Sequence, residues 1–177
     1  MNKIIKAFLL SFVALNIITL IAAFFFPKEY TVTQSLEIQA PIEKVFPLVA
    51  DFSKWKEWSP WYQVEPIAHY DQVGTMASIN SQLKWDGRII GKGAMTLSKI
   101  ENFKKIVMNL KFEKPRKMES VSEFTFEPKG QSTLVTWTDQ GSLSYPIGRI
   151  FKKYIVAMLG KDFEQGLTNL QTRAQKP

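Results

Sequence analysis

Hydrophobic and polar residues follow a helical period near the end of the chain. Between Tyr145 and Ala174, apolar residues recur at steps of three and four, which places them on one face of an α-helix. The members of this apolar stripe are Ile147, Ile150, Phe151, Tyr154, Ile155, Met158, Leu159, Phe163, Leu167 and Leu170. The opposite face carries charged and amide side chains, as a solvated helix surface does. The pattern predicts one long amphipathic helix around which the other elements pack.

A two-residue alternation, typical of strands, governs most of the segment between residues 30 and 144. The first strand is expected over Tyr30–Gln39, and six more follow, separated by turn residues. These six are expected at Glu65–Tyr70, Thr75–Trp85, Arg88–Glu101, Lys104–Phe112, Met118–Glu127 and Ser132–Ser144. Strands joined by short loops pair antiparallel. The fold class is therefore α+β, with a curved antiparallel sheet of about seven strands wrapped around the long helix.

Two short helices are expected after the first strand. The first opens at Pro41, because proline is tolerated at the first helical position. Pro47 removes a backbone donor inside this helix and should end or kink it early. The second helix carries Trp55 and Trp58 one turn apart, and either Asp51 or Ser53 can cap it.

Residues 7–26 contain no charged side chain, and these twenty residues would rise about 30 Å as a helix, the hydrocarbon thickness of a bilayer. A cleaved signal peptide is the alternative, since Lys3 and Lys6 would supply its basic start. However, the apolar run is long for a signal peptide, and its exit, Phe24–Pro27, is bulky where cleavage needs small residues. We therefore expect a transmembrane anchor at residues 1–27 and a soluble domain at residues 28–177.

The lysines on either side of the apolar run predict its orientation. Lys3, Lys6 and the amino terminus precede the run, whereas Lys28 follows it next to Glu29. Positive charge favours the cytoplasmic side. The expected location is the cell membrane, crossed once, with a cytoplasmic N-terminus and a non-cytoplasmic domain.

The composition excludes several kinds of site. The chain has no cysteine and a single histidine, His69, so thiolate and histidine metal clusters are excluded and no cofactor is expected. The net charge of +7 is spread through strands and loops, so nucleic acid is not expected as a partner. No catalytic constellation is visible. His69 is interpreted as an ordinary strand histidine, and Glu123 and Asp139 are expected to face solvent although they lie in apolar strands.

A sheet curled around one helix leaves an internal pocket unless large side chains fill it. Gly91 and Gly93 within a strand, and Gly160 within the long helix, are consistent with such space. The side chains expected to line the pocket are Trp58, Trp61, Trp85, Phe112, Trp137, Tyr154 and Met158. For the tryptophans, core packing or an aromatic collar near the bilayer is the alternative to ligand contact.

A series of short motifs runs through the chain after Pro27. They are Ile38–Phe46, Asp51–Trp55, Trp58–Trp61, the glycines and aromatic residues between Tyr70 and Gly93, Val135–Trp137 and Gly160–Leu167. In this order and spacing they resemble the helix-grip superfamily, often labelled SRPBCC, which includes START domains, birch-pollen allergen-like proteins and polyketide cyclase/dehydrase-like proteins. The polyketide cyclase-like branch is the most similar, and Pro47 departs from its pattern. The resemblance implies a cavity for a hydrophobic ligand in a family of both enzymes and binding proteins.

Three functions are consistent with these features. The first is a membrane-tethered domain that binds a hydrophobic small molecule or lipid in an internal cavity. The second is a polyketide cyclase/dehydratase-like enzyme, whose signature would be a buried carboxylate, histidine or tyrosine with a shifted pKa facing the cavity. The third is a non-ligand interaction module with a filled core. We expect the first, because it accounts for the anchor, the curved sheet and the missing catalytic set.

Overall fold

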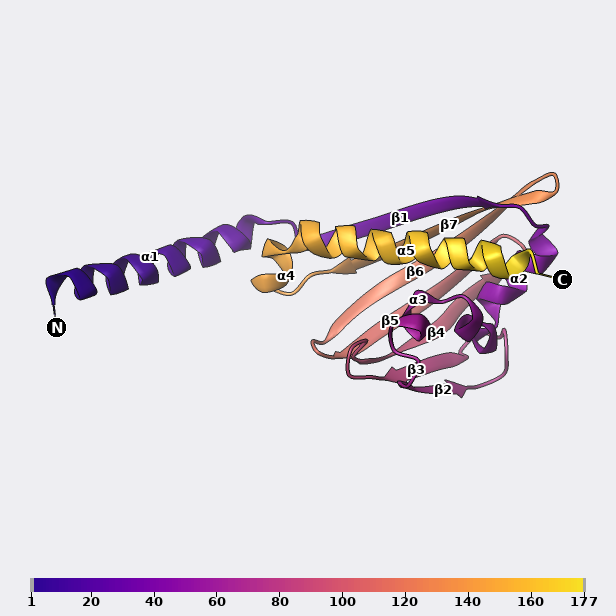
Figure 1. The fold of residues 1–177 in the computed structure, drawn as a ribbon, viewed down its shortest axis with the longest axis horizontal. Coiled ribbons are helices and arrows are strands. Elements are labelled where there is room, and N and C mark those ends of the chain that lie inside the picture. The colour runs from indigo at the N-terminus through magenta and orange to yellow at the C-terminus, as the bar shows by residue number, and fades with distance from the viewer. Residues whose placement is uncertain (1, 177) are drawn as a thin grey trace.

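The computed structural model describes residues 2–176, in which one long helix projects from an α+β domain (Figure 1). The helices are α1 (Lys3–Phe25), α2 (Ile42–Ala50), the 3₁₀-helix η1 (Phe52–Glu57), α3 (Pro60–Val64), α4 (Ile147–Ile150) and α5 (Lys152–Ala174). The strands are β1 (Glu29–Ile38), β2 (His69–Val73), β3 (Gln82–Asp86), β4 (Lys92–Glu101), β5 (Lys105–Lys114), β6 (Met118–Lys129) and β7 (Ser132–Ser142). All seven strands pair antiparallel in one sheet of order β1-β7-β6-β5-β4-β3-β2. The helix-grip fold class predicted from the sequence is confirmed.

The core lies between the sheet and α5, which runs along the sheet beside β1 and β7 (Figure 1). Alternate strand residues point inward because successive side chains of a strand face opposite sides. Val135 and Trp137 of β7 and Phe124 of β6 are buried, for example, whereas the intervening Thr136 and Thr138 are not. The outward face of the sheet is therefore polar, and the inward face forms a continuous apolar cluster.

The two ends of the sheet have different neighbours. Residues paired at one end are Glu29 and Ser142, Phe112 and Met118, and Asp86 and Lys92. The β3–β4, β5–β6 and β7–α4 connections lie at this end. The junction with α1 lies here too, because β1 begins only four residues after the last residue of α1. We call it the proximal end and the opposite end the distal end.

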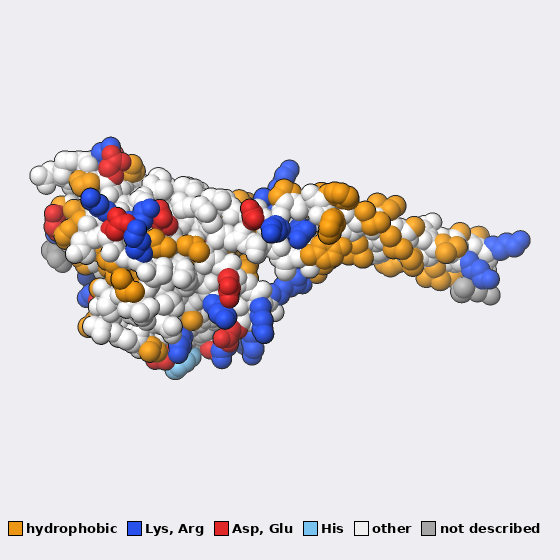
Figure 2. Space-filling model, turned by 180° about the vertical axis from the view of Figure 1, so that it is seen from behind, with side chains coloured by type: hydrophobic (Ala, Val, Ile, Leu, Met, Phe, Trp, Pro, Cys, Tyr) orange, Lys and Arg blue, Asp and Glu red, His pale blue; other side chains and the backbone are white. Residues whose placement is uncertain are grey.

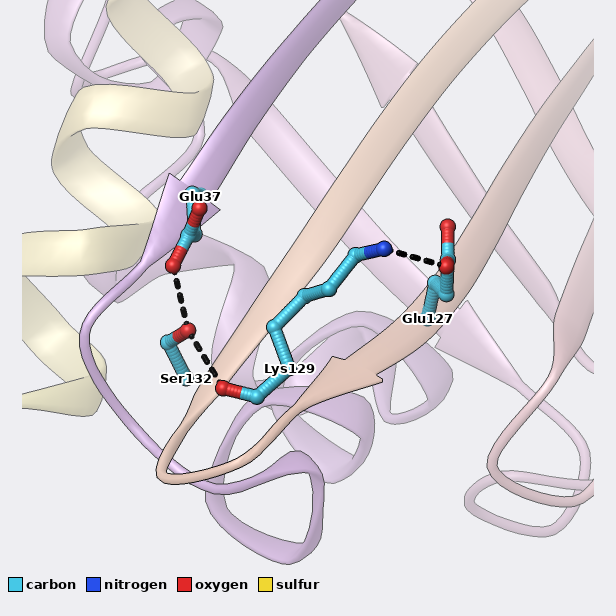
Figure 3. Close-up of polar contacts among 4 residues, drawn as sticks. All are labelled: Glu37, Glu127, Lys129 and Ser132. Carbon is cyan, nitrogen blue, oxygen red and sulfur yellow. Dashed lines mark hydrogen bonds and ion pairs between the residues drawn. The ribbon is translucent and has the colours of Figure 1, made fainter.

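Polar contacts close the distal end, where the β6–β7 turn meets the end of β1 (Figure 3). The Ser132 hydroxyl donates to a Glu37 carboxylate oxygen at 2.5 Å and lies 2.9 Å from the Lys129 carbonyl oxygen. Lys129 also pairs with Glu127 at 2.5 Å. The Ser132–Glu37 bond joins the edge strand β1 to the β6–β7 hairpin, whereas the Lys129–Glu127 pair lies within β6.

Helix α2 continues through Pro47 to Ala50, so the expected early end is wrong. Pro47 lies on the exposed side of α2, where water can bond the carbonyl group that lacks a backbone donor. The next helix is the predicted one: the Asp51 side chain accepts a hydrogen bond from the Ser53 backbone at 2.9 Å and begins η1. It carries Trp55 into the core.

The strand limits between residues 65 and 86 differ from the prediction. Glu65 ends α3 as its cap instead of starting a strand, and β2 lies at His69–Val73. The Glu65 carboxylate accepts hydrogen bonds from the backbone of Arg88 (2.8 Å), Ile89 (2.8 Å) and Ile90 (3.0 Å). These bonds hold the pKa of Glu65 below its usual range, and the bond from Ile90 has the largest effect. Glu65 therefore fixes the β3–β4 connection at the proximal end.

The C-terminal helix is divided in two, because residue Phe151 caps α4 before α5 begins. The apolar stripe is buried only in its second half, at Phe163, Leu167 and Leu170. In the first half most stripe residues are exposed, although Ile155 and Leu159 pack against the core. These exposed residues are Ile147, Ile150, Phe151, Tyr154 and Met158.

Helix α1 has 23 residues, a length of about 34 Å at about 1.5 Å per residue, and its mean hydropathy makes it apolar enough to cross a membrane. Two of its polar side chains bond within the helix: Asn16 donates to the Phe12 carbonyl at 2.8 Å, and Thr19 to the Leu15 carbonyl at 2.9 Å. Figure 2 shows hydrophobic side chains covering most of this helix. These properties suit a lipid environment, where unpaired polar groups are costly.

Candidate functional site

An apolar cavity lies between the inner face of the sheet and α5, with a volume of about 50 Å³. Its deep wall is made of fully buried side chains, namely Trp55, Met95, Met108, Trp137 and Phe163. Its outer wall is made of partly exposed side chains, namely Trp61, Leu110, Phe112, Met118 and Leu159. Phe112 and Met118 flank the β5–β6 connection. The mouth of the cavity is therefore at the proximal end.

The deep wall is rigid because its aromatic rings pack on one another and have bonded N–H groups. Trp137 stacks on Phe163 of α5 with ring centroids 4.0 Å apart and an interplanar angle of 6°. The Trp137 indole donates to the Ser122 hydroxyl at 2.7 Å, and the Trp55 indole donates to the Val49 carbonyl at 2.9 Å. Buried indoles need such partners. These contacts hold the aromatic part of the deep wall in place.

One polar cluster faces the cavity. Asp139 of β7 is 5% exposed, and its two carboxylate oxygens accept hydrogen bonds from the Tyr30 hydroxyl at 2.8 Å and the Ser120 hydroxyl at 3.1 Å. The three residues come from adjacent strands, since Gly141 pairs with both Tyr30 and Ser120. A Cβ on Gly141 would lie 2.8 Å from the Tyr30 hydroxyl, so glycine makes room for the tyrosine ring to reach Asp139.

Burial controls the protonation of this cluster. Desolvation raises the pKa of Asp139, and the hydrogen bonds from Tyr30 and Ser120 offset part of that effect. The pKa of Tyr30 is raised too, first by burial and then by the adjacent Asp139 charge. A carboxyl group with a raised pKa can give or take a proton nearer neutral pH than an ordinary aspartate. The cavity thus combines an apolar wall with one group able to bond a ligand or transfer a proton.

The prediction that Asp139 faces solvent is therefore wrong, whereas Glu123 faces outward and pairs with Lys105 at 3.0 Å. The sequence contained a signal for Asp139. Val135, Trp137 and Asp139 are two residues apart, so a strand that buries the first two also points the third inward. Tyr30 and Ser120 had no comparable signal, because their proximity to Asp139 depends on strand register.

Three of the aromatic residues expected at the cavity line it: Trp61, Phe112 and Trp137. Trp58 is buried behind the cavity against Trp55, with ring centroids 4.7 Å apart, and its indole bonds the Leu48 carbonyl. Trp85 is buried at the flank of Phe112, with centroids 5.5 Å apart. Neither residue belongs to the lining.

Tyr154 and Met158 lie outside the cavity, 68% and 45% exposed. The helical stripe contains them, but it is their neighbours Ile155 and Leu159 that pack against the core. Their neighbour Leu159 points into the cavity instead. His69 is at an exposed position at the start of β2.

The glycines serve close packing and do not line the cavity. A Cβ on Gly93 would lie 2.5 Å from the Trp85 ring, and one on Gly91 would lie 2.2 Å from the Lys114 carbonyl oxygen. Gly160 faces the side chain of Gln34, outside the sheet-enclosed space. Gly166 lets α5 approach the Trp137 ring, which a Cβ would meet at 2.8 Å.

A larger hollow, of about 410 Å³, is an open groove on the outside of the domain between β1 and α5. It is lined by Thr31–Gln34 of the edge strand and by Val156, Ala157, Gly160, Lys161 and Glu164. Its ionisable side chains, Lys161 and Glu164, are exposed to solvent. We therefore place the candidate site in the smaller internal cavity, where a buried polar group faces an apolar wall.

Comparison with known proteins assigns the family. Residues 29–175 match the family described as polyketide cyclase / dehydrase and lipid transport. No curated protein matches the chain.

Solved structures share the fold at low sequence identity. A Nitrosospira multiformis protein is 17% identical with a TM-score of 0.61, covering 83% of this chain and 97% of its own. A Thermus thermophilus protein is 19% identical with a TM-score of 0.63, covering 82% of this chain and 97% of its own. CalU16 from Micromonospora echinospora is 14% identical with a TM-score of 0.54, covering 83% of this chain and 76% of its own. The chain from β1 to the end of α5 thus has the fold and the sequence pattern of ligand-binding SRPBCC domains, and it belongs to the polyketide cyclase/dehydrase and lipid-transport family.

Proposed function

We propose that this protein is a membrane-tethered binding domain for a hydrophobic small molecule or lipid, held in the internal cavity with its polar group at Asp139. The observation that carries the proposal is the buried Asp139 cluster in an otherwise apolar wall. Burying a carboxylate costs stability, and well-packed apolar residues at the same place are often neutral or better. A polar anchor for a ligand gives this costly arrangement a use.

The size of the cavity sets how a ligand enters. Ligand pockets commonly hold about 300–1,000 Å³, so a lipid-sized molecule must displace side chains at the mouth of a 50 Å³ cavity. Met118 and Leu159 are partly exposed there, and methionine adapts its shape at low cost. Each methylene buried contributes about 0.8 kcal/mol before ordering costs, so a short alkyl chain suffices to offset moving two side chains.

The tether in this proposal is α1, with the domain boundary near Pro27. The predicted orientation places the N-terminus in the cytoplasm and the domain on the other side of the membrane. Alkaline extraction should leave the full chain in the membrane fraction, and a topology reporter fused after Pro177 should report the non-cytoplasmic side. Release of the uncleaved chain would contradict the anchor, and a cytoplasmic signal would contradict the orientation.

Adjacent residues of α5 provide a matched test of the cavity. Leu159 lines the cavity and Met158 is exposed, so Leu159→Trp should fill the mouth while Met158→Trp should leave it open. We expect the full chain in nanodiscs to bind an environment-sensitive fatty-acid probe with saturation. Leu159→Trp should weaken the apparent affinity at least tenfold, and Met158→Trp less than twofold. Equal effects of the two variants, or no saturable binding, would refute the cavity as the site and favour an interaction module.

A second function, a cyclase/dehydratase-like enzyme, is favoured by the raised pKa of Asp139 beside the Tyr30 hydroxyl. In a dehydration, the Asp139 carboxylate would take the proton next to the carbonyl of a β-hydroxy carbonyl compound. It would return that proton to the departing hydroxyl, releasing water and an enone. Enone absorbance should then rise with the wild type and not with Asp139→Asn. Saturable probe binding with no enone from either protein would leave binding as the function.

A further inference from the structure

An apolar patch is exposed at the proximal end of the domain. Its residues come from the β7–α4 connection, α4 and the first turns of α5. They are Tyr145, Ile147, Ile150, Phe151, Tyr154 and Met158. Each is between 36% and 68% exposed. Contiguous exposed apolar side chains of this kind mark an interaction surface.

Basic side chains also lie at the proximal end, near the mouth of the cavity, although the exposed Glu113 and Glu119 flank them. The end of β5 and the β5–β6 connection carry Lys114, Arg116 and Lys117, all exposed, and no ion pair among residues 2–176 neutralises them. Lys153 of α5 is exposed beside the apolar patch. Figure 2 shows Lys and Arg side chains on the part of the domain next to α1, with Asp and Glu side chains among them, and a second mixed group toward the other end. Basic residues next to exposed apolar ones suit an anionic lipid surface.

Hydrogen bonds fix the depth of the apolar patch relative to α1. The Tyr145 hydroxyl donates to the Leu20 carbonyl at 2.8 Å, and Arg149 donates to the Phe24 carbonyl at 3.1 Å. Leu20 lies five residues inside the end of α1, or about 7.5 Å at about 1.5 Å per residue. When α1 spans a bilayer, α4 is therefore held at the boundary between head groups and hydrocarbon, where aromatic and apolar side chains bury.

We propose that the proximal end of the domain docks on the bilayer that α1 spans, inserting the apolar patch among the lipids and placing the basic β5–β6 connection against anionic head groups. The proposal rests on the membrane tether of the proposed function and adds a route for its ligand. Because the cavity mouth is at this end, an apolar molecule passes between bilayer and cavity without crossing water. Docking makes the surrounding membrane the source and the acceptor of the ligand.

The absence of cysteine from the chain allows a direct test with single labels. Tyr154→Cys reports the patch, and Met76→Cys is the matched control, since Met76 is 61% exposed in the β2–β3 connection at the distal end. Each full-length variant carries an NBD fluorophore and is reconstituted in phosphatidylcholine vesicles with 30% phosphatidylserine. Nitroxide-labelled lipids should quench the label at residue 154 at least threefold more than the label at residue 76. Equal quenching at the two positions, whether weak or strong, overturns the docking.

A second comparison tests the basic connection. Lys114→Gln with Lys117→Gln should reduce quenching at residue 154 at least twofold in these vesicles, and 0.5 M salt should act in the same direction. Lys54→Gln with Lys56→Gln removes the same charge from η1 and should have no effect. The helix η1 lies at the C-terminal end of α5, where Glu57 pairs with Arg173. Quenching that ignores both the first pair and salt would overturn the role of the basic side chains.

The ligand proposal and the docking proposal fail separately. If the fatty-acid probe binds and the labels at residues 154 and 76 are quenched equally, the docking proposal is refuted and the ligand proposal stands. Strong quenching at residue 154 without saturable probe binding supports docking and refutes the cavity ligand alone.

Discussion

Removal of the Asp139 side chain should destabilise the protein by a predictable amount. In Asp139→Ala, the hydroxyls of Tyr30 and Ser120 lose their acceptor inside the core. Leaving a buried hydroxyl unpaired costs about 1–3 kcal/mol, or about 2–6 kcal/mol for the two. Relief of the desolvated carboxylate offsets part of this cost. We expect a net loss of about 2–4 kcal/mol, which at about 2–4 °C per kcal/mol for a domain of this size lowers the Tm by about 5–15 °C.

The isosteric variant Asp139→Asn separates the charge from the hydrogen bonds. Its amide oxygen can accept from Tyr30, and its amide nitrogen can donate to the Ser120 hydroxyl, which turns to accept. The buried charge disappears while both contacts remain. We therefore expect the free energy of unfolding of Asp139→Asn at pH 7 to exceed that of the wild type by no more than about 1 kcal/mol.

The sign of the pH dependence follows from the raised pKa of Asp139. The unfolded chain releases this proton at a pKa of about 3.9, so the folded protein binds more protons between that value and its own higher pKa. Stability contributed by this group is present below pH 4 and falls as the pH rises through the folded pKa. Asp139→Asn should lack this fall, so the difference between the two proteins grows in favour of the variant as the pH rises.

Thermal unfolding of the full chain in detergent micelles, followed by tryptophan fluorescence between pH 4 and pH 8, measures all three proteins. Equal losses in Asp139→Ala and Asp139→Asn would mean that the hydrogen bonds do not carry the effect. If the Tm of the wild type and the Tm of Asp139→Asn changed in parallel with pH, Asp139 would not titrate as a buried group. Either result would remove the basis for assigning it a role in ligand binding.

Two further outcomes follow from the packing of α5. Gly166→Ala puts a Cβ 2.8 Å from the Trp137 ring and should cost about 1–3 kcal/mol by overpacking in the same unfolding assay. Gly160→Ala meets only the Gln34 side chain, at 3.4 Å, and should stabilise by up to about 1 kcal/mol through helix propensity; equal effects at the two glycines would contradict the observed approach of the helix to the sheet.

Local patterns in the sequence determined most elements of this fold, but not the limits of β2 and β3 or the break between α4 and α5. The two-residue alternation predicts the strands, with β5, β6 and β7 close to their observed limits, because side-chain orientation in a strand depends only on position. The uncharged run before Pro27 predicts α1 in the same way, from length and composition alone. Capping by Asp51 is equally local, since the bonded groups are two residues apart.

Tertiary structure alone decided where the cavity lies and what faces it. The apolar stripe of α5 is continuous in the sequence, but in its first half the core covers only part of its width, so Leu159 lines the cavity and Tyr154 is exposed. No local pattern encodes which part of the stripe the core covers. The bond between Tyr30 and Asp139 joins residues 109 positions apart, and strand register sets it. Register and the overlap of helix and sheet are properties of the assembled chain, because they depend on contacts between segments far apart in the sequence.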